Sequence, residues 1–112
     1  MCDKYNGWTN YETWNLKLWI DNEEGSQNYW RKNAEECYRN ADKDDILTRK
    51  ESATNDLAGM LKSDAEENMP VVTGFYADVL EAAVSSVNFY EIAKSMIDDV
   101  ADEIDKEEKE DA

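Results

Sequence analysis

Apolar residues recur three and four positions apart along five stretches of this sequence, and polar or turn-forming residues separate the stretches. Such spacing places apolar side chains on one face of an α-helix. It predicts helices over residues 10–24, 27–41, 46–68, 75–87 and 89–104. The pair Val71-Val72 has strand character, but no second β-rich run exists to pair with it, so it is interpreted as a loop. The pattern therefore predicts an all-α fold.

Two pairs of polar residues mark expected helix starts. Thr9 and Glu12 form a capping box, in which the two side chains satisfy free backbone N–H groups of the first turn. Asn88 and Glu91 have the same spacing, with Asn in place of the usual Ser or Thr. These pairs are expected to open the first and the last helix.

The length of 112 residues suits one domain with a single core. Residues 1–112 are therefore interpreted as one compact acidic domain of about five helices. The first two helices are expected to form an aromatic-rich hairpin, with Gly25 ending one helix and Ser26 capping the next. Residues 105–112 have almost no apolar content and are expected to form a disordered acidic tail.

All four tryptophans lie within residues 6–30, at Trp8, Trp14, Trp19 and Trp30. Because each large ring buries on the order of 150–250 Å², the later helices are expected to pack against this segment. Trp8 precedes the helix cap, and Trp19 lies off the main apolar stripe. These two rings are therefore the candidates for exposed anchors of a protein interface.

This segment also carries a resemblance. The string GWTNYETW at residues 7–14, followed by LWIDN at residues 18–22, resembles small proteins of phages, plasmids and related mobile elements with a GWxNYETW-type signature. The resemblance is confined to residues 6–30 and brings no catalytic residues with it. It implies an origin in a mobile element, where short acidic proteins often act against host defence systems.

The charge balance narrows the range of partners. There are 27 acidic residues against 12 Lys and Arg, a formal net charge of −15. This charge disfavours nucleic acid and anionic membranes as direct partners and favours a basic protein surface. No apolar run approaches the roughly 18 residues of a membrane-spanning helix, and the N-terminus lacks a signal-peptide pattern. We expect a protein of the host cytoplasm.

Cysteine and histidine usage excludes several kinds of chemistry. With no histidine, Ser-His and Cys-His catalysis and His-ligated zinc are impossible. Cys2 and Cys37 lack metal-ligand spacing, and Cys37 is expected to be a buried free thiol. A calcium loop starting at Asp42 would need glycine where Leu47 stands and glutamate where Ala53 stands. We therefore expect no metal, no cofactor and no enzymatic activity.

Carboxylates gather beside the apolar stripe of the last helix and in the break before the third helix. Residues four apart on a helix are separated by about 6 Å along its axis, and the charges of one DNA strand repeat at about 3.4 Å of rise. Rows of carboxylates are therefore able to occupy a groove built for nucleic acid. The candidate binding residues are Asp98, Asp99, Asp102, Glu103 and Asp105, with Asp42, Asp44 and Asp45.

The leading hypothesis is a phage-encoded inhibitor of the anti-CRISPR or anti-restriction type. It would act as an acidic DNA mimic on the basic surface of a host nucleic-acid-binding protein, such as a CRISPR effector or a restriction enzyme. The alternative is a non-mimetic adaptor that binds a host protein through the aromatic hairpin, with Trp8 and Trp19 as anchors. Two plainer interpretations remain: solvated acidic faces with a solubilising tail, or the acidic surface of a halophile. The target and the oligomeric state stay open.

Overall fold

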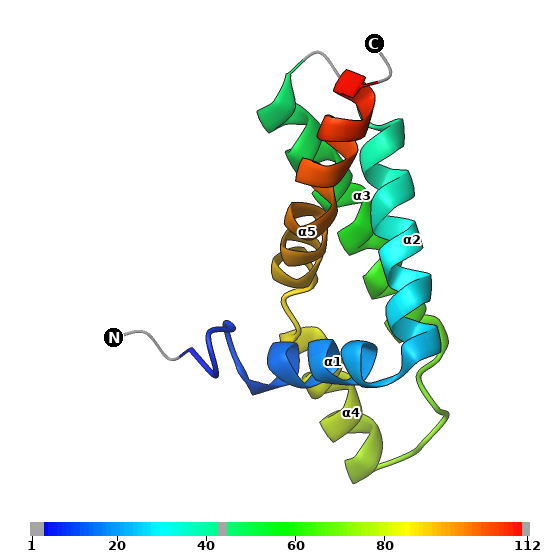
Figure 1. Cartoon of the computed structure of the whole chain (residues 1–112). Helices are drawn as coiled ribbons and strands as arrows, with labels where there is room; N and C mark the ends of the chain where they lie inside the picture. Colours follow the sequence, from blue (N-terminus) through cyan, green and yellow to red (C-terminus); the bar gives the residue numbers. More distant parts are fainter. Residues whose placement is uncertain (1–3, 43–44, 111–112) are drawn as a thin grey trace.

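Five helices make up the fold, as the sequence pattern predicts. The computed structural model describes residues 4–42 and 45–110. The helices are α1 (Tyr11–Asn22), α2 (Glu24–Asn40), α3 (Ile46–Glu67), α4 (Phe75–Ser86) and α5 (Phe89–Glu110) (Figure 1). Apart from one isolated bridge between Tyr5 and Trp8, the described residues contain no β-structure. The all-α, single-domain prediction is confirmed.

Three of the helices, α2, α3 and α5, form an elongated bundle, and α1 lies across one end of it (Figure 1). The molecule measures 57 × 34 × 24 Å. The bundle centres on α5, because an unbroken apolar stripe of this helix faces both neighbours. The buried residues of α5 are Ile92, Ala93, Met96, Ile97, Val100, Ala101 and Ile104.

The tryptophan-rich segment is not the centre of the core, contrary to expectation. Of its four tryptophans only Trp30, on α2, is buried; Trp8 and Trp14 are half-buried and Trp19 is 64% exposed. The reason is the crossing of α1 over the end of the bundle, which presents a single narrow face to the other helices. The buried residues of that face are Thr13 and Ile20.

The turn between α1 and α2 is shorter than predicted. Glu23 alone connects the two helices, in an extended conformation, and its carbonyl accepts the first bond of α2 from the Gln27 N–H at 2.8 Å. The prediction that Gly25 stops a helix and Ser26 caps one is wrong, since both lie in the first turn of α2. A helical glycine costs about 1 kcal/mol against alanine, and packing of the rest of α2 offsets that amount.

The first helix is capped by Asn10 rather than by Thr9, which corrects the predicted capping box. The Asn10 Oδ1 atom accepts hydrogen bonds from the Thr13 N–H at 2.9 Å and from the Thr13 hydroxyl at 2.6 Å. The Asn10 side-chain amide donates to the carbonyl of Ser86 at 2.7 Å. One side chain therefore both starts α1 and ties it to the end of α4.

The predicted cap of the last helix is confirmed at Asn88, but Glu91 does not complete the capping box, because its carboxylate bonds Thr9 instead of the Asn88 N–H. The Glu91 N–H donates to the Asn88 side chain at 3.0 Å, while the Glu91 carboxylate accepts from the Thr9 N–H at 2.9 Å. The Asn88 N–H donates to the Thr13 hydroxyl at 2.9 Å. We call these residues, with Asn10, the capping knot: Thr9, Asn10, Thr13, Asn88 and Glu91. The knot fixes α1 to the α4–α5 junction.

The expected disordered tail is wrong for residues 105–110. The last helix continues to Glu110, beyond the predicted end at Ile104, and residues 111–112 lie outside the described part of the chain. Apolar content alone predicted fraying, but carboxylates of this segment bind arginine side chains of α2 and α3. Those contacts stabilise the last turns.

Thr13→Val tests the capping knot. The substitution keeps the shape of a fully buried side chain but leaves the Asn88 N–H without its acceptor, so the free energy of unfolding should fall by about 1–3 kcal/mol. Urea denaturation followed by circular dichroism measures this quantity. Thr54→Val is the matched control, because the buried Thr54 hydroxyl bonds only the carbonyl of Lys50, one turn earlier on α3. Equal losses in the two variants would contradict the role given to Thr13.

Candidate functional site

The acidic ridge predicted on the last helix is partly neutralised. Asp98 lies 3.2 Å from the Lys94 ammonium and 3.8 Å from that of Lys50. Glu103 lies 3.7 Å from the Arg31 guanidinium. These pairs are exposed and contribute little to stability, but they interrupt the predicted row of free carboxylates.

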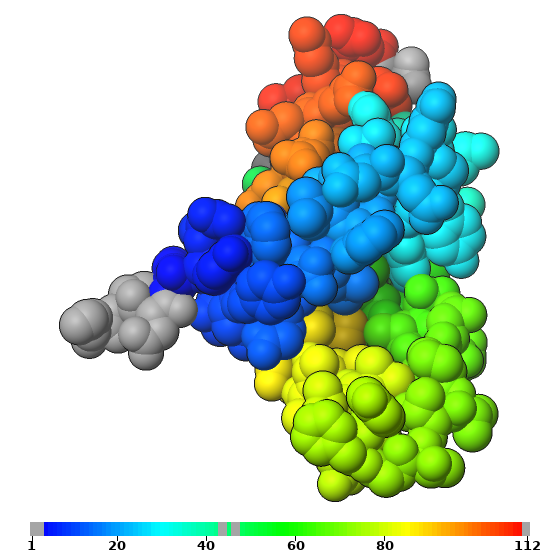
Figure 2. Space-filling view, turned by 90° about the horizontal axis from the view of Figure 1, so that it is seen from below, coloured from blue at the N-terminus to red at the C-terminus, as the bar shows by residue number. Residues whose placement is uncertain are grey.

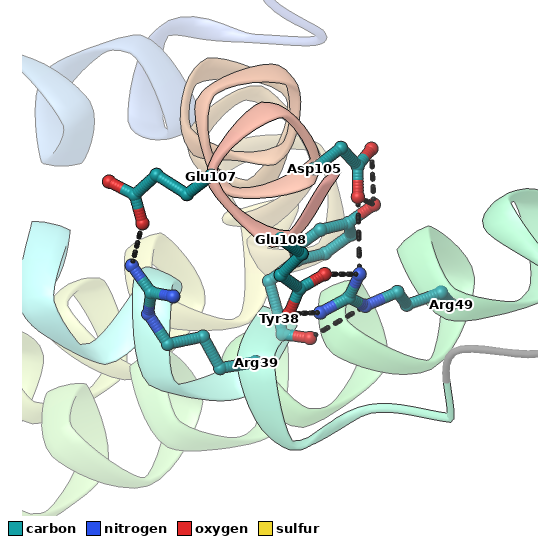
Figure 3. Close-up of polar contacts among 6 residues, drawn as sticks. All are labelled: Tyr38, Arg39, Arg49, Asp105, Glu107 and Glu108. Atoms are coloured by element: carbon teal, nitrogen blue, oxygen red, sulfur yellow. Dashed lines mark hydrogen bonds and ion pairs between the residues drawn. The ribbon is translucent and has the colours of Figure 1, made fainter. Parts of the chain in front are cut away.

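Asp105 has a structural partner inside the bundle (Figure 3). The Arg49 side chain of α3 is only 3% exposed. Its Nη1 atom lies 3.1 Å from Asp105, and its two terminal nitrogens bind Glu108 in a bidentate pair at 2.7 and 3.0 Å. Its Nε–H donates to the Tyr38 carbonyl at 2.9 Å. Asp105 therefore joins α5 to α3 and is not available as a phosphate substitute.

The hydroxyl of Tyr38 completes this group, which we call the Arg49 cluster: Tyr38, Arg49, Asp105 and Glu108. The hydroxyl donates to both Asp105 oxygens, at 2.9 and 3.0 Å, and the Arg49 guanidinium lies 4.0 Å above the tyrosine ring. Burial, followed by the hydrogen bond to Asp105, raises the pKa of Tyr38 to about 12. The hydrogen bonds to Glu108 raise the pKa of Arg49 above its ordinary value, so this cation keeps its charge.

The remaining predicted acids do not form one row of carboxylates without bonding partners. Asp99 and Asp102 are exposed and have no ion pair within the described part of the chain. Asp45 accepts a hydrogen bond from the Thr48 hydroxyl at 3.2 Å, and Asp42 is exposed. Asp44 lies outside the described residues. The mimic hypothesis requires five exposed carboxylates without ion pairs on α5. Within the described residues, Asp99 and Asp102 meet that requirement.

The two candidate tryptophan anchors differ in exposure. Trp8 packs half-buried against the core and lines a shallow cleft of about 480 Å³ together with Asp98 and Asp99. Trp19 is exposed, as its position off the apolar stripe predicts. Tyr11, also on α1, is half-exposed and stacks edge-on against Tyr5 at 5.2 Å.

Several exposed apolar side chains lie on α4, where the sequence pattern predicted an apolar stripe. No residue of α4 is buried, and the helix packs mainly against α1. Phe75 and Tyr76 are 74% and 71% exposed and form a T-shaped pair with centroids 5.5 Å apart. With the half-exposed Val79 they form the surface that we call the α4 tip: Phe75, Tyr76 and Val79. Figure 2 shows α1 and the chain around α4 side by side on the face seen from below.

The stretch of sequence that contains the α4 tip carries charged residues of one sign. Between residues 63 and 93 the sequence contains six acidic residues and no Lys or Arg. The ion pairs that the structure contains lie instead on the bundle and α1.

Other kinds of site find no support in the described residues. No group of three or more carboxylate or cysteine side chains converges there as a metal site would require. No helix in the described part of the chain has an apolar stretch of the length that a bilayer span requires. Cys37 is a buried free thiol, as predicted, and burial raises its pKa.

Comparison with known proteins identifies a family. The model of a family described as "Family of unknown function (DUF7249)" matches residues 1–110, so the chain belongs to that family. No curated protein and no solved structure matches this chain.

Arg49→Ala should destabilise the fold strongly. Removing the guanidinium leaves Asp105 and Glu108 without their cation in a partly buried site, a loss of about 3 kcal/mol in the free energy of unfolding. Urea denaturation measures it. Arg39→Ala is the matched control. Arg39 binds Glu107, the neighbour of Glu108 on α5, at 2.8 Å, but this pair is exposed (Figure 3). Its loss should therefore lower the free energy of unfolding far less. A comparable loss from the control would show that net charge, not the buried cluster, governs stability.

Alkaline pH should weaken the Arg49 cluster through Tyr38. The folded-state pKa of about 12 lies above the ordinary value of 10, so the folded state holds this proton more tightly than the unfolded state. The contribution is complete below pH 10 and is lost as the pH rises toward 12. The urea midpoint of the native chain should therefore fall between pH 10 and 12 more steeply than that of Tyr38→Phe. Parallel curves for the two proteins would contradict this assignment.

Proposed function

We propose that this protein is a non-catalytic inhibitor that binds a basic, nucleic-acid-handling protein of the host through the α4 tip. The observation that carries the proposal is an apolar helix end without cover in a region that lacks any Lys or Arg. Exposed aromatic pairs of this kind typically anchor protein interfaces. Apolar patches on monomers often mark such interaction sites.

The class of partner follows from charge. A surface with aromatic anchors, on a stretch of sequence whose charged residues are all acidic, complements an apolar patch bordered by Lys and Arg. Proteins that bind nucleic acid carry such basic surfaces, because they must neutralise phosphates. The resemblance of residues 7–14 to mobile-element proteins supports a host defence protein, such as a CRISPR effector or a restriction enzyme, as the target.

Inhibition in this proposal comes from occupation of the partner's surface and does not need a row of phosphate-like charges. The net charge of −15 speeds association with a basic target, and the aromatic residues slow dissociation. The predicted hairpin anchor Trp19 is exposed on α1, the helix against which α4 packs.

DNA mimicry is the second candidate, in a reduced form. It is favoured by Asp99 and Asp102, which are exposed and without a cation within the described residues. In this case, binding would depend on these two carboxylates and would weaken steeply with salt, because mimicry of phosphates relies on charge.

The double variant Phe75→Ala/Tyr76→Ala tests the first candidate. Affinity-tagged protein is exposed to host lysate, captured proteins are identified by mass spectrometry, and the effect on their DNA binding is then measured by fluorescence anisotropy. The native chain should displace labelled DNA from the captured protein. Loss of both rings should weaken binding at least about tenfold, as expected for hot-spot aromatics. The stability of the fold should change little, since both rings are exposed.

Three comparison variants separate the alternatives. Tyr29→Ala removes a similarly exposed ring from α2 and should leave binding unchanged. A selective loss in Trp19→Ala would place the anchor on the N-terminal hairpin instead. If Asp99→Lys/Asp102→Lys abolishes binding while Phe75→Ala/Tyr76→Ala binds fully, mimicry is established and the role of the α4 tip is refuted.

A further inference from the structure

A groove separates α4 from the end of α3. The loop that follows α3 and one face of α4 line a hollow of about 350 Å³. Most of the side chains that line it are apolar, although polar atoms make up more of its exposed surface, and we call it the α4 groove: Met69, Pro70, Val72, Ala77, Leu80 and Val84. The groove exists because α4 packs mainly against α1 and stands apart from α3.

The hollow continues along α4 toward the start of α5. A second cleft of about 250 Å³ shares Glu66, Val84 and Ser85 with the first and ends against Val87 and Phe89. Each volume is at or below the low end of the roughly 300–1,000 Å³ typical of small-molecule sites. Two joined clefts of this size, lined by apolar side chains and by polar atoms, suit a row of side chains from an amphipathic peptide segment.

Carboxylates flank the apolar walls. Glu66 stands at the α3 side and Glu81 at the α4 side, and both are exposed. Lys62, at the far end of the second cleft, is the cation among the lining residues. A segment that enters the groove therefore meets an apolar floor and two anionic edges, which complements apolar residues flanked by Lys or Arg.

A second copy of this chain is a poor occupant. It would bring the same carboxylates to both edges and a further charge of −15, and like charges placed together oppose association. The charge of the groove thus selects a basic occupant of different sequence.

We propose that the α4 groove binds a basic amphipathic helical segment of the partner. Apolar residues spaced three and four apart enter the groove, as in other helix-in-groove complexes, and Lys or Arg residues pair with Glu66 and Glu81. This assignment rests on the proposed function for the identity of the partner, and the groove is testable without it.

The probe is a synthetic 18-residue peptide of Leu and Lys with leucines at helical spacing. Titration into methyl-labelled native protein, followed by NMR at 150 and 500 mM NaCl, should shift the signals of Val72, Leu80 and Val84 first. A peptide with Glu in place of Lys should not bind. Shifts spread evenly over the acidic surface, or no shifts in the groove, would overturn the proposal.

A groove-filling variant gives the matched comparison. Ala77 lines the groove, whereas Ala82 is exposed on the same helix and does not line it. Ala77→Phe should weaken peptide binding at least about tenfold, and Ala82→Phe should not. Circular dichroism establishes that both variants fold.

A second comparison tests the two carboxylates at the edges of the groove, Glu66 and Glu81, and leaves the packing of the groove unchanged. Glu66→Gln/Glu81→Gln should weaken the peptide by about threefold to tenfold, while Glu23→Gln/Glu24→Gln, with the same change in net charge, should have a smaller effect. Equal effects in the two pairs would overturn the proposed contacts.

Failure of the groove and failure of the proposed function give different results. Inhibition of a captured host protein that survives Ala77→Phe but not loss of Phe75 and Tyr76 would reject the groove alone. Peptide binding in the groove without any inhibition of a nucleic-acid-handling protein would reject the function alone.

Discussion

A buried arginine holds together a chain that carries a large excess of negative charge. The last turns of α5 are rich in carboxylates, which oppose the dipole of their own helix. Arg49 offsets this cost from inside the bundle, because its guanidinium binds Asp105 and Glu108 and its Nε–H binds the Tyr38 carbonyl. Three helices meet at this one cation. The long α5, and the core built on it, depend on that contact.

The acidic residues fall into two groups, those that have cations beside them in the bundle and those around α4. In the bundle, cations from α2, α3 and α5 lie beside Asp98, Glu103 and Asp105, so much of the charge there is locally compensated. At the opposite end, the sequence from residue 63 to residue 93 contains no Lys or Arg, and Lys62 is the one basic residue that lines the clefts beside α4. The uncompensated charge therefore coincides with the exposed aromatic residues of the α4 tip. That coincidence, rather than the total charge, is what points to a basic partner.

The helices were predictable from local patterns in the sequence, although the cap of α1 and the turn before α2 were misplaced by a few residues, and features that depend on distant contacts were missed. Periodicity gave the five helices, the burial of Cys37 and the cap at Asn88, since each is decided within a few turns. The end of α5 was missed because Arg49 and Arg39, far away in sequence, bind its carboxylates. The α4 stripe was assigned to the core because an apolar pattern does not reveal whether another helix covers it. For the same reason the site on α4 was not predicted, whereas the exposure of Trp19 was.

The capping knot explains why the most distinctive string of the sequence does not have to be the binding site. Thr9, Asn10 and Thr13 use their polar groups to start α1 and to bond Ser86, Asn88 and Glu91 at the α4–α5 junction. These bonds set where α4 leaves the bundle, and so they hold it apart from α3. In the proposed function, residues 9–13 would act through position, because they anchor the helix that carries the groove and the aromatic tip.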